Sequence, residues 1–498
     1  MVGAGRHAQG CRSAPRWGAA LLGLAVCAAV ALMPGQAQAG RIASISVPET
    51  VQPLEPGEQF PPLLDPAPVN SSWAAKDFHP LGVCLDNYEL TQQQVSAAQG
   101  TGCGLVRLRI PMEHFIEENT ANWAVLDQVV SRLERAGFEI MPVLDADAAI
   151  PEFYRQFCSA VAKRYGKTFK YYQLLDNINY KIGLDTRAYA DLVSASRTAI
   201  VLSDDDAVIV SGGIRGVDLT YLEMLNNQGA MRGLDVLAFN LYPPPVPVET
   251  TDSPVRREHC LPFMADAIDW ARAHDKRVWV TSYGVSTSYN WVGVDQPRQA
   301  AMYARGALYL GWLGVERIVF AAIQDSDAQY QDPSRCFGLL DVSGAPKASY
   351  FTLQALNNLV AGAYNVSPPF LYQGYTYETP EAADMVISPS LSGLPGADAL
   401  AEFQVHNLPV YAFWFYAPAR QEYRMVYWLG LPGRYRVLMT LNIGHIGLTP
   451  IDRFLFLDNA PSPVNYQFAQ NFLYLPYLPI DELPGVVRFE VNENGRPR

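Results

Sequence analysis

Residues 105–110 read LVRLRI, residues 139–144 read EIMPVL, and an amphipathic segment at residues 123–136 separates them. The two outer stretches are short and rich in branched apolar residues, which is typical of buried strands. The middle segment repeats its apolar residues at the spacing of a helix. Parallel strands need a long crossover connection, so this order predicts a strand–helix–strand unit of a parallel sheet.

The same unit repeats on both sides of this stretch. Further strands are predicted at residues 81–84, 171–175, 207–211, 236–241, 277–282 and 317–322, and further helices at 152–165, 187–202, 262–274 and 296–311. Eight strands alternating with helices over residues 78–364 predict the α/β class and a (β/α)8 TIM barrel. A doubly wound open sheet is the alternative, and the lack of a Gly-rich phosphate loop after the first strand disfavours it.

Residues 365–498 have a different pattern. Aromatic and β-branched runs such as YAFWFY at 411–416, MVYW at 425–428 and YRVLM at 435–439 are separated by Pro/Gly turns. This composition predicts an accessory β-domain resembling a β-sandwich. Its aromatic residues suit either a sugar-stacking surface or ordinary core packing.

The N-terminus has the features of a secretory signal peptide at residues 1–39. Three arginines precede an apolar run at residues 19–33, and Ala37-Gln38-Ala39 forms a small-x-small cleavage site before Gly40. The run is shorter than the roughly 20 residues that span a bilayer. We therefore expect a secreted, periplasmic or cell-envelope protein with no transmembrane segment in the mature chain. Residues 40–77 are Pro-rich and predict an extended spacer.

Composition narrows the possible partners. The 498 residues include 37 Lys and Arg against 49 Asp and Glu, a formal net charge of −12, which argues against nucleic-acid binding. With 49% hydrophobic and 17% charged residues, the chain is not predominantly disordered. The mature part holds five cysteines without paired spacing, and the histidines are scattered. We predict buried thiols, no metal site and no cofactor.

Several stretches resemble the clan A glycoside hydrolases, retaining (β/α)8 enzymes of families such as 5 and 39. They are VRLR at 106–109, NW at 122–123 with LD at 126–127, GFEIMPVL at 137–144, KRVWVTSYG at 276–284, and FGLLD at 337–341 with PKASY at 346–350. The resemblance covers the predicted barrel. It implies a site at the carboxyl ends of the strands and a polysaccharide or oligosaccharide partner.

The same resemblance implies that catalysis is lost. The family uses one Glu after the fourth strand as general acid/base and one Glu on the seventh as nucleophile, about 5–5.5 Å apart. The matching positions hold Asn177 and Ser282. Asn carries no titratable proton near neutral pH, and Ser carries no charge to stabilise an oxocarbenium ion. Other positions differ as well: Asn240 stands where the family often has His, and Ala321 and Ala322 replace bulky aromatics.

Three functions remain open from the sequence. The first is a pseudo-glycosidase that binds a polysaccharide without hydrolysing it. Its expected substrate contacts are Arg107, Asp176, Asn177, Asn240, Tyr242, Tyr283 and Trp291. Each also has a structural alternative: Tyr283 in the core, Trp291 as a loop anchor, and Asp176 as an ion-pair partner of Arg107.

The second function is an active hydrolase or transglycosylase that uses relocated carboxylates. Acidic residues at strand ends are the candidates, with Asp176, Asp325 and Asp327 as the main ones and Glu113, Asp145 and Asp147 as others. Acids at strand ends are common as loop caps, so a compensating pair is not favoured. The third function is an envelope scaffold or adhesion protein without sugar binding.

Overall fold

The computed structural model describes one compact unit within Pro61–Arg498. Its described residues are 71–75, 77–86, 88–115, 120–147, 150–181, 183–246, 248, 253, 256–366, 372–377, 387–391, 401–405, 408–417, 422–429, 435–442, 448–456, 461–469, 472–480 and 482–491. The predicted signal peptide and residues 40–70 of the Pro-rich segment lie outside them.

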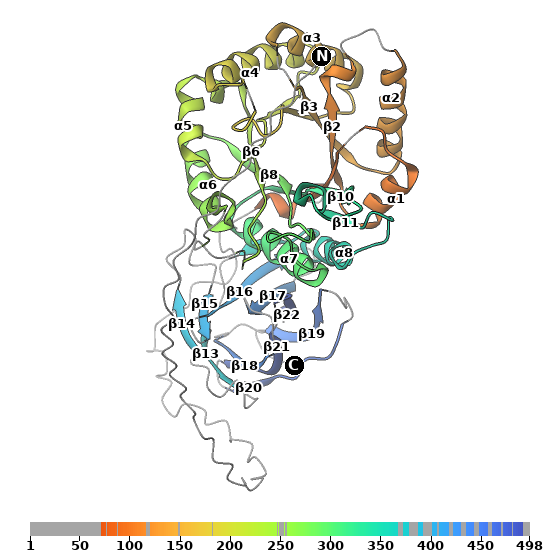
Figure 1. Cartoon of the computed structure of the whole chain (residues 1–498). Helices are drawn as coiled ribbons and strands as arrows, with labels where there is room; N and C mark the ends of the chain where they lie inside the picture. The colour runs from red at the N-terminus through yellow and green to blue at the C-terminus, as the bar shows by residue number, and fades with distance from the viewer. Residues whose placement is uncertain are drawn as a thin grey trace, which may run out of the picture. The chain divides into compact units, whose positions relative to one another are not determined.

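Eight parallel strands form a closed barrel (Figure 1). They are β1 (Leu81–Leu85), β2 (Leu105–Pro111), β3 (Glu139–Asp145), β4 (Tyr171–Leu174), β5 (Val208–Val210), β7 (Val236–Leu241), β8 (Arg277–Tyr283) and β9 (Arg317–Phe320). β1 pairs with β9 and β5 pairs with β7, so the ring has no open edge. The TIM barrel prediction is confirmed, and the open-sheet alternative is wrong.

Helices surround this ring of strands. They are α1 (Gln92–Gly100), α2 (Thr120–Arg135), α3 (Pro151–Tyr165), α4 (Thr186–Val201), α5 (Leu219–Asn227), α6 (Met264–Ala273), α7 (Gln296–Leu313) and α8 (Ala348–Val360). Short polar residues start several of them: Thr91, Asp185, Asp218 and Asp295 each accept a hydrogen bond from a backbone N–H in the first turn. Such caps satisfy amide groups that have no partner inside the helix.

Short elements complete the barrel. The 3₁₀ helices are η1 (Ser71–Ala74), η2 (Met112–His114), η3 (Ala230–Gly233), η4 (Arg257–His259), η5 (Leu261–Phe263) and η6 (Pro333–Arg335). The two-residue β6 (Ile214–Arg215) pairs with β7, and β10 (Ala322–Gln324) pairs with β11 (Gly338–Leu340). The elements η2, η4, η5, η6, β6 and β10 lie in segments that follow barrel strands. By contrast, η1 precedes β1, and η3 lies between α5 and β7.

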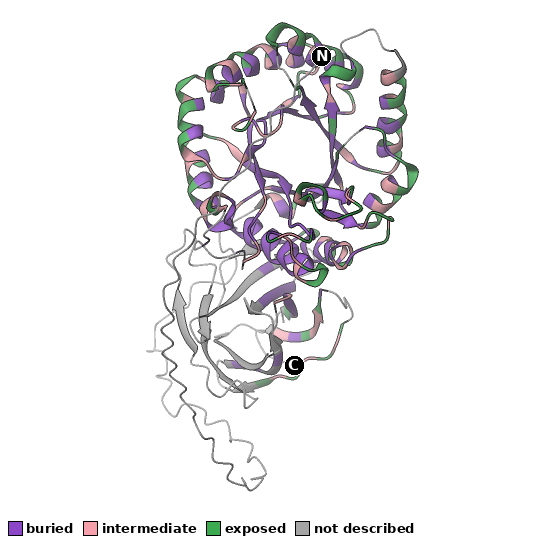
Figure 2. Ribbon diagram, viewed as in Figure 1, coloured by how far each residue is buried: buried purple, intermediate pink, exposed green. Residues whose placement is uncertain are grey.

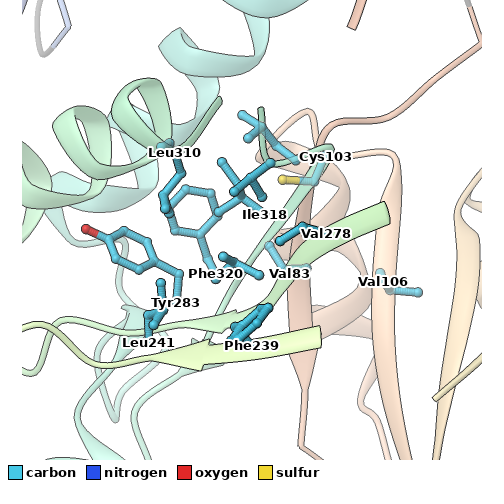
Figure 3. Packing of buried hydrophobic residues seen from close by; sticks show 14 of the residues in the cluster. Val83, Cys103, Val106, Phe239, Leu241, Val278, Tyr283, Leu310, Ile318 and Phe320 are labelled. Atoms are coloured by element: carbon cyan, nitrogen blue, oxygen red, sulfur yellow. The ribbon is translucent and has the colours of Figure 1, made fainter. Parts of the chain in front are cut away.

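Strand residues alternate between two packing layers. Cys84, Leu105, Met141, Tyr171, Val210, Val236, Ala238, Trp279 and Val319 form one buried cluster inside the barrel. Their chain neighbours Val83, Val106, Phe239, Val278 and Ile318 belong to the larger cluster between strands and helices (Figure 3). Figure 2 shows the result, with buried residues along the strands and exposed residues on the outer faces of the helices. The twofold alternation of a strand produces both layers.

One end of the barrel interior is closed by a buried cation. The guanidinium of Arg317 lies 4.6 Å from the ring centre of Tyr171 and 4.8 Å from that of Trp279, and it pairs with Glu139 at 2.5 Å. Aromatic rings and one carboxylate compensate the buried charge. This packing fills the amino-terminal end of the barrel and leaves the carboxyl end for the site.

Two antiparallel sheets follow the barrel. The first contains β12 (Tyr364–Val366), β14 (Ile387–Leu391), β15 (Ala401–Val405), β16 (Leu408–Ala417), β17 (Glu422–Leu429), β19 (Leu448–Leu455) and β22 (Gly485–Val491). The second contains β13 (Tyr372–Tyr377), β18 (Tyr435–Asn442), β20 (Gln467–Ala469) and β21 (Phe472–Ile480). They are consistent with the expected accessory β-domain; its boundaries and its sandwich form stay predictions.

The cysteines of the described residues are buried and free: Cys84, Cys103, Cys158, Cys260 and Cys336. This confirms the expectation of buried thiols. None of the helices formed by the described residues is long and apolar enough to cross a membrane.

Candidate functional site

A pocket of about 710 Å³ opens at the carboxyl ends of the barrel strands. In a (β/α)8 barrel this is the end where active sites are built. The strands and the residues directly after them contribute Cys84, Asp86, Arg107, Arg109, Asp145, Asp176, Asn177, Arg215, Tyr242, Ser282, Ala321 and Ala322 to its lining. The loops add Tyr180, Lys181, Arg256, Ser326, Pro333, Ser334, Arg335 and Phe337.

Strand periodicity explains why charged residues reach this pocket. On β2, Leu105 belongs to the cluster inside the barrel, while Arg107 and Arg109, two and four positions further on, line the pocket. Alternate residues of a strand point to the same side. The polar residues therefore follow the apolar ones along the same inner face and form the pocket floor.

Asp176 is the most extensively bonded acid of the pocket. Its Oδ1 lies 2.8 Å from Arg107 Nη2 and accepts hydrogen bonds from Asn240 Nδ2 at 2.8 Å and Gln173 Nε2 at 3.3 Å. Asn177 Nδ2 donates to Oδ2 at 3.5 Å. This arrangement confirms that Asp176 is the ion-pair partner of Arg107, and it places both side chains in the pocket wall.

The backbone at the end of β4 is unusual. Leu175 has a φ of 65° and Asn177 a φ of 49°, both in the left-handed region that favours glycine. Leu175 is held there by burial and by its amide, which donates to the Leu144 carbonyl at 3.0 Å. Such conformations cluster at functional sites. Here the left-handed conformations direct the side chains of Asp176 and Asn177 into the pocket.

Ser282 on β8 and Tyr242 after β7 form a second polar pair. Their hydroxyl oxygens are 3.0 Å apart. The Tyr242 amide donates to His259 Nδ1 at 3.1 Å, and the ring of Tyr242 stacks on that of Phe337 with centroids 5.2 Å apart. Burial, with smaller effects from Arg215 and Arg256, lowers the pKa of His259 to about 3. The imidazole is therefore neutral near pH 7 and holds the Tyr242 backbone.

The three acids that line the pocket differ in their surroundings. Burial raises the pKa of Asp145, but Lys181 and Arg109 outweigh it, so its pKa is lowered overall. Asp86, at the exposed rim, has a raised pKa because the pocket walls desolvate its carboxyl group. The Cys84 thiol lies 3.5 Å from Asp86 Oδ1. Burial therefore dominates at Asp86, whereas the neighbouring cations dominate at Asp145.

Six residues predicted from the sequence come together in the pocket: Arg107, Asp145, Asp176, Asn177, Tyr242 and Ser282. Asn240 is fully buried behind them and donates to Asp176 and to Asn177 Oδ1 at 3.1 Å. Asn240 therefore contributes to the site indirectly, because its hydrogen bonds orient the side chains of Asp176 and Asn177. Ala321 and Ala322 also line the pocket, so small side chains stand at the two positions where the resemblance implies bulky aromatic residues.

Two predicted substrate contacts lie elsewhere. Tyr283 is fully buried near Leu310 and Phe320 (Figure 3), and its hydroxyl donates to the Met302 carbonyl at 2.8 Å. The register of β8 against β7 and β9 shifts after Val280. This shift interrupts the alternation, so Tyr283 faces α7 and Ser282 faces the pocket. Trp291 is 69% exposed and lies outside the pocket lining. The expected substrate contact is wrong for Tyr283, and for Trp291 it stays a prediction.

The two other main acid candidates have structural partners instead. Asp325 is buried, 2.5 Å from Lys347 Nζ, and accepts a hydrogen bond from the Gly338 amide. Asp327 accepts from the amides of Gln329 and Asp332 and closes a turn. Neither lines the pocket, so the fallback catalytic assignment of both is corrected. Glu113 accepts from the Asp147 amide in an exposed loop.

Sequence reasoning missed several pocket residues. Asp86 directly follows the first predicted strand and Arg109 shares the alternation of Arg107, so both carried a readable signal. Arg215, Arg256 and Arg335 come from short elements between the predicted strands and helices, where no periodicity places a side chain. The described residues contain no group of three or more His, Cys, Asp or Glu that could hold a metal ion.

Comparisons with known proteins rest on the fold. No protein-family model matches the sequence, and no curated protein matches it. A family 39 glycoside hydrolase from Bacteroides cellulosilyticus WH2 is similar in structure, with a TM-score of 0.55 and 16% identity over 83% of this chain and 81% of that chain. A family 30 subfamily 8 xylanase from Clostridium acetobutylicum gives 0.53 and 13% over 83% and 96%.

A family 30 endoxylanase from Clostridium papyrosolvens C71 also has a TM-score of 0.53, with 10% identity over 83% of this chain and 97% of that chain. At sequence identities this low, structural similarity shows a shared fold and does not show a shared activity. Together with the closed parallel barrel and its carboxyl-end pocket, these similarities show that this chain has a clan A glycoside-hydrolase-like (β/α)8 fold.

Proposed function

We propose that this chain is an exported pseudo-glycosidase, which binds a polysaccharide in the barrel pocket without hydrolysing it. One observation carries the proposal. The residues that line the pocket at the expected acid/base and nucleophile positions are Asn177 and Ser282, and neither is a carboxylic acid. Proton transfer by a positioned acid is worth roughly 10²–10⁴-fold in rate, and Asn supplies none of it.

The remaining pocket acids support this proposal, because two of them are committed to cations. Asp176 pairs with Arg107, and Asp145 pairs with Arg109 and Lys181 at 2.7 and 3.0 Å. A carboxylate held by arginine or lysine accepts hydrogen bonds and has no proton to donate. These acids suit binding of sugar hydroxyl groups better than protonation of a glycosidic oxygen.

The pocket also has the features that saccharide binding needs. Its volume of about 710 Å³ falls in the ordinary range for small-ligand sites, roughly 300–1,000 Å³. Asn177, Ser282 and Tyr242 offer donors and acceptors, and Phe337 adds an aromatic ring beside them. Polar groups of this kind fix the orientation of a sugar, and an aromatic ring packs against its C–H face.

Affinity electrophoresis of residues 40–498 through gels that contain single plant, microbial or host polysaccharides tests the binding. We expect retardation by at least one polymer, and we expect Tyr242→Phe and Ser282→Ala to reduce it. Asn358→Ala, on the exposed face of α8, is the control that leaves retardation unchanged. Retardation by none of the polymers would contradict the proposal and favour the scaffold function.

A second candidate function is favoured by Asp86. Burial raises the pKa of its carboxyl group, and a raised pKa is what the general acid of a glycosidase needs. On this reading the chain hydrolyses its polysaccharide slowly through Asp86. Release of reducing ends that disappears in Asp86→Asn would establish it.

A further inference from the structure

The pocket wall carries more positive than negative charge. Six cationic side chains line it, Arg107, Arg109, Lys181, Arg215, Arg256 and Arg335, against the three acids Asp86, Asp145 and Asp176. The whole chain, by contrast, has a net charge of −12. The positive charge is therefore concentrated in this pocket and does not follow from a basic surface.

The available acids leave part of this charge uncompensated. Asp176 is committed to Arg107, and Asp145 is shared by Arg109 and Lys181, so one carboxylate serves two cations. Arg335 pairs with Asp332 at 3.6 Å, where both side chains are exposed. An exposed pair of this kind contributes little.

Arg215 and Arg256 have no carboxylate partner within ion-pair distance among the described residues. Both side chains line the same pocket. Burial lowers the pKa of Arg256, and repulsion from Arg215 lowers it further. Glu258 attracts Arg256 and partly offsets this effect. Two like charges in a half-buried wall are unfavourable unless an anion joins them.

Contacts within the fold hold Arg215 in place. The Arg215 amide donates to Asn179 Oδ1 at 2.9 Å, its carbonyl accepts from Asn179 Nδ2 at 3.1 Å, and its guanidinium lies 4.9 Å from the ring centre of Tyr180. Arg256 has a φ of 50° at the start of η4. Positioned guanidinium groups lose little freedom when they bind an anion, and their planar donors match carboxylate and sulfate oxygens.

We propose that the pocket takes an acidic saccharide, in which a carboxylate or sulfate group on a sugar binds Arg215 and Arg256 together. This inference rests on the proposed function, because it names the class of polysaccharide that the pocket holds. Neutral hydroxyl groups would bind Asn177, Ser282 and Tyr242, and the anionic group would set the specificity.

Isothermal titration of residues 40–498 tests this inference with oligouronides, with the same oligouronides after reduction of their carboxyl groups to alcohols, and with sulfated oligosaccharides. The reduced sugars keep the linkage and lose only the charge. We expect binding of an anionic oligosaccharide, at least tenfold weaker binding of its neutral counterpart, and weaker binding as salt rises. The uronide and sulfate arms identify which anion is bound.

Arg215→Gln and Arg256→Gln should each lower the affinity about tenfold or more, because a hydrogen bond to a charged group is worth about 1.5–3 kcal/mol. Arg272→Gln, which removes an exposed arginine of α6, is the matched control with no effect on affinity. Arg215→Lys keeps the charge and should bind better than Arg215→Gln. The titrations of the unmodified chain keep the test valid if a variant folds poorly.

The outcomes separate this inference from the proposed function. Equal affinity for charged and reduced oligosaccharides, or unchanged affinity in both Gln variants, would overturn the acidic specificity and leave sugar binding intact. Retention of neutral polysaccharides alone would do the same. Binding of no saccharide of either kind would overturn both.

Discussion

The ion pair between Arg107 and Asp176 joins two strands across the pocket floor, and Arg107 is only 4% exposed. Removal of one partner from a buried pair leaves an uncompensated charge. We therefore expect Asp176→Asn to lower the free energy of unfolding by about 3 kcal/mol, as measured in urea. The exposed pair of Glu152 and Arg155 provides the control, since Glu152→Gln should change stability little.

A combined Arg107→Gln, Asp176→Asn variant should recover part of that loss, because no buried charge is left unpaired. A single variant as stable as the unmodified chain would mean that the pair does not stabilise the pocket floor. It would also remove the argument that Asp176 is committed to a cation.

The buried imidazole of His259 gives the protein a specific pH dependence. Its pKa of about 3 in the folded state lies below the ordinary value of 6.5, so the unfolded chain binds more protons between these two values. Stability therefore falls as pH drops through that window, by about 1.4 kcal/mol for each pH unit. The effect is fully absent above pH 7, where both states are neutral.

His259→Asn should remove this dependence, since the Asn oxygen can still accept from the Tyr242 amide. Between pH 7 and pH 5 the unmodified chain should lose about 2 kcal/mol more stability than the variant. Urea unfolding at the two pH values measures the difference. Equal losses would show that His259 is not kept neutral by burial.

At the scale of the elements, the backbone after β4 adopts a conformation that positions pocket residues. Asn177 has a φ of 49°, at which an ordinary Cβ costs roughly 1–2 kcal/mol. We expect Asn177→Gly to be more stable than Asn177→Ala by about 1 kcal/mol, although both lose the same side-chain bonds. In a helix the order is reversed, so Ala160→Gly on the exposed face of α3 should be destabilising.

The difference in stability between the two Asn177 variants reports on the backbone conformation alone, because both variants lose the same side-chain hydrogen bonds. Thermal or urea unfolding of both proteins is sufficient. A Gly variant less stable than the Ala variant would contradict the left-handed conformation at this position.

A second element-scale contact connects β10 with the start of α8. Asp325 and Lys347 form an ion pair in which both side chains are almost completely buried. Burial raises the pKa of Asp325, an effect that Lys347 opposes, and burial lowers the pKa of Lys347. Asp325→Ala should therefore cost about 3–5 kcal/mol of stability.

Replacement of both partners, as in Asp325→Leu with Lys347→Met, should recover most of that loss. Retardation by the bound polysaccharide should persist in every folded variant, because neither residue lines the pocket. A folded Asp325 variant that no longer binds sugar would return this residue to the functional site.

The strands and five of the longer helices were predictable because their periodicity follows from burial, whereas α8 (Ala348–Val360) was not predicted. The predicted strand at residues 236–241 matches β7, and the helix predicted at 187–202 matches α4 to within one residue at each end. α1 was missed because Val95 and Ala98 are its only buried residues, too few for a recognisable pattern. α5 was missed as well, since its nine residues carry the weak signal of a short helix.

The site was predictable only as far as strand positions place side chains. Asn177 and Ser282 were found through the resemblance, and Arg107 through its place on β2. Arg215 and Arg256 reach the pocket from β6 and from the start of η4, elements too short to leave a periodic signal. Tyr283 was assigned to the wrong side of β8, because the register of the neighbouring strands shifts there and sequence cannot locate such a shift.

At the scale of the whole molecule, the pocket lies where (β/α)8 barrels build active sites. Its lining includes three acids, and two of them, Asp145 and Asp176, are paired with cations. A shared fold does not by itself carry an activity. On the proposed function, the cationic side chains of the pocket would attract anionic ligands although the whole chain has a net charge of −12.

The central claim, binding without hydrolysis, is tested most directly by reducing-end release. Purified residues 40–498 are incubated with a polysaccharide that retards them, from pH 4 to pH 9, beside a heat-treated control. The account predicts no release above that control while retardation persists in the same samples. Release that survives Asn177→Ala and Ser282→Ala but is lost in Asp86→Asn would contradict it and identify an active hydrolase.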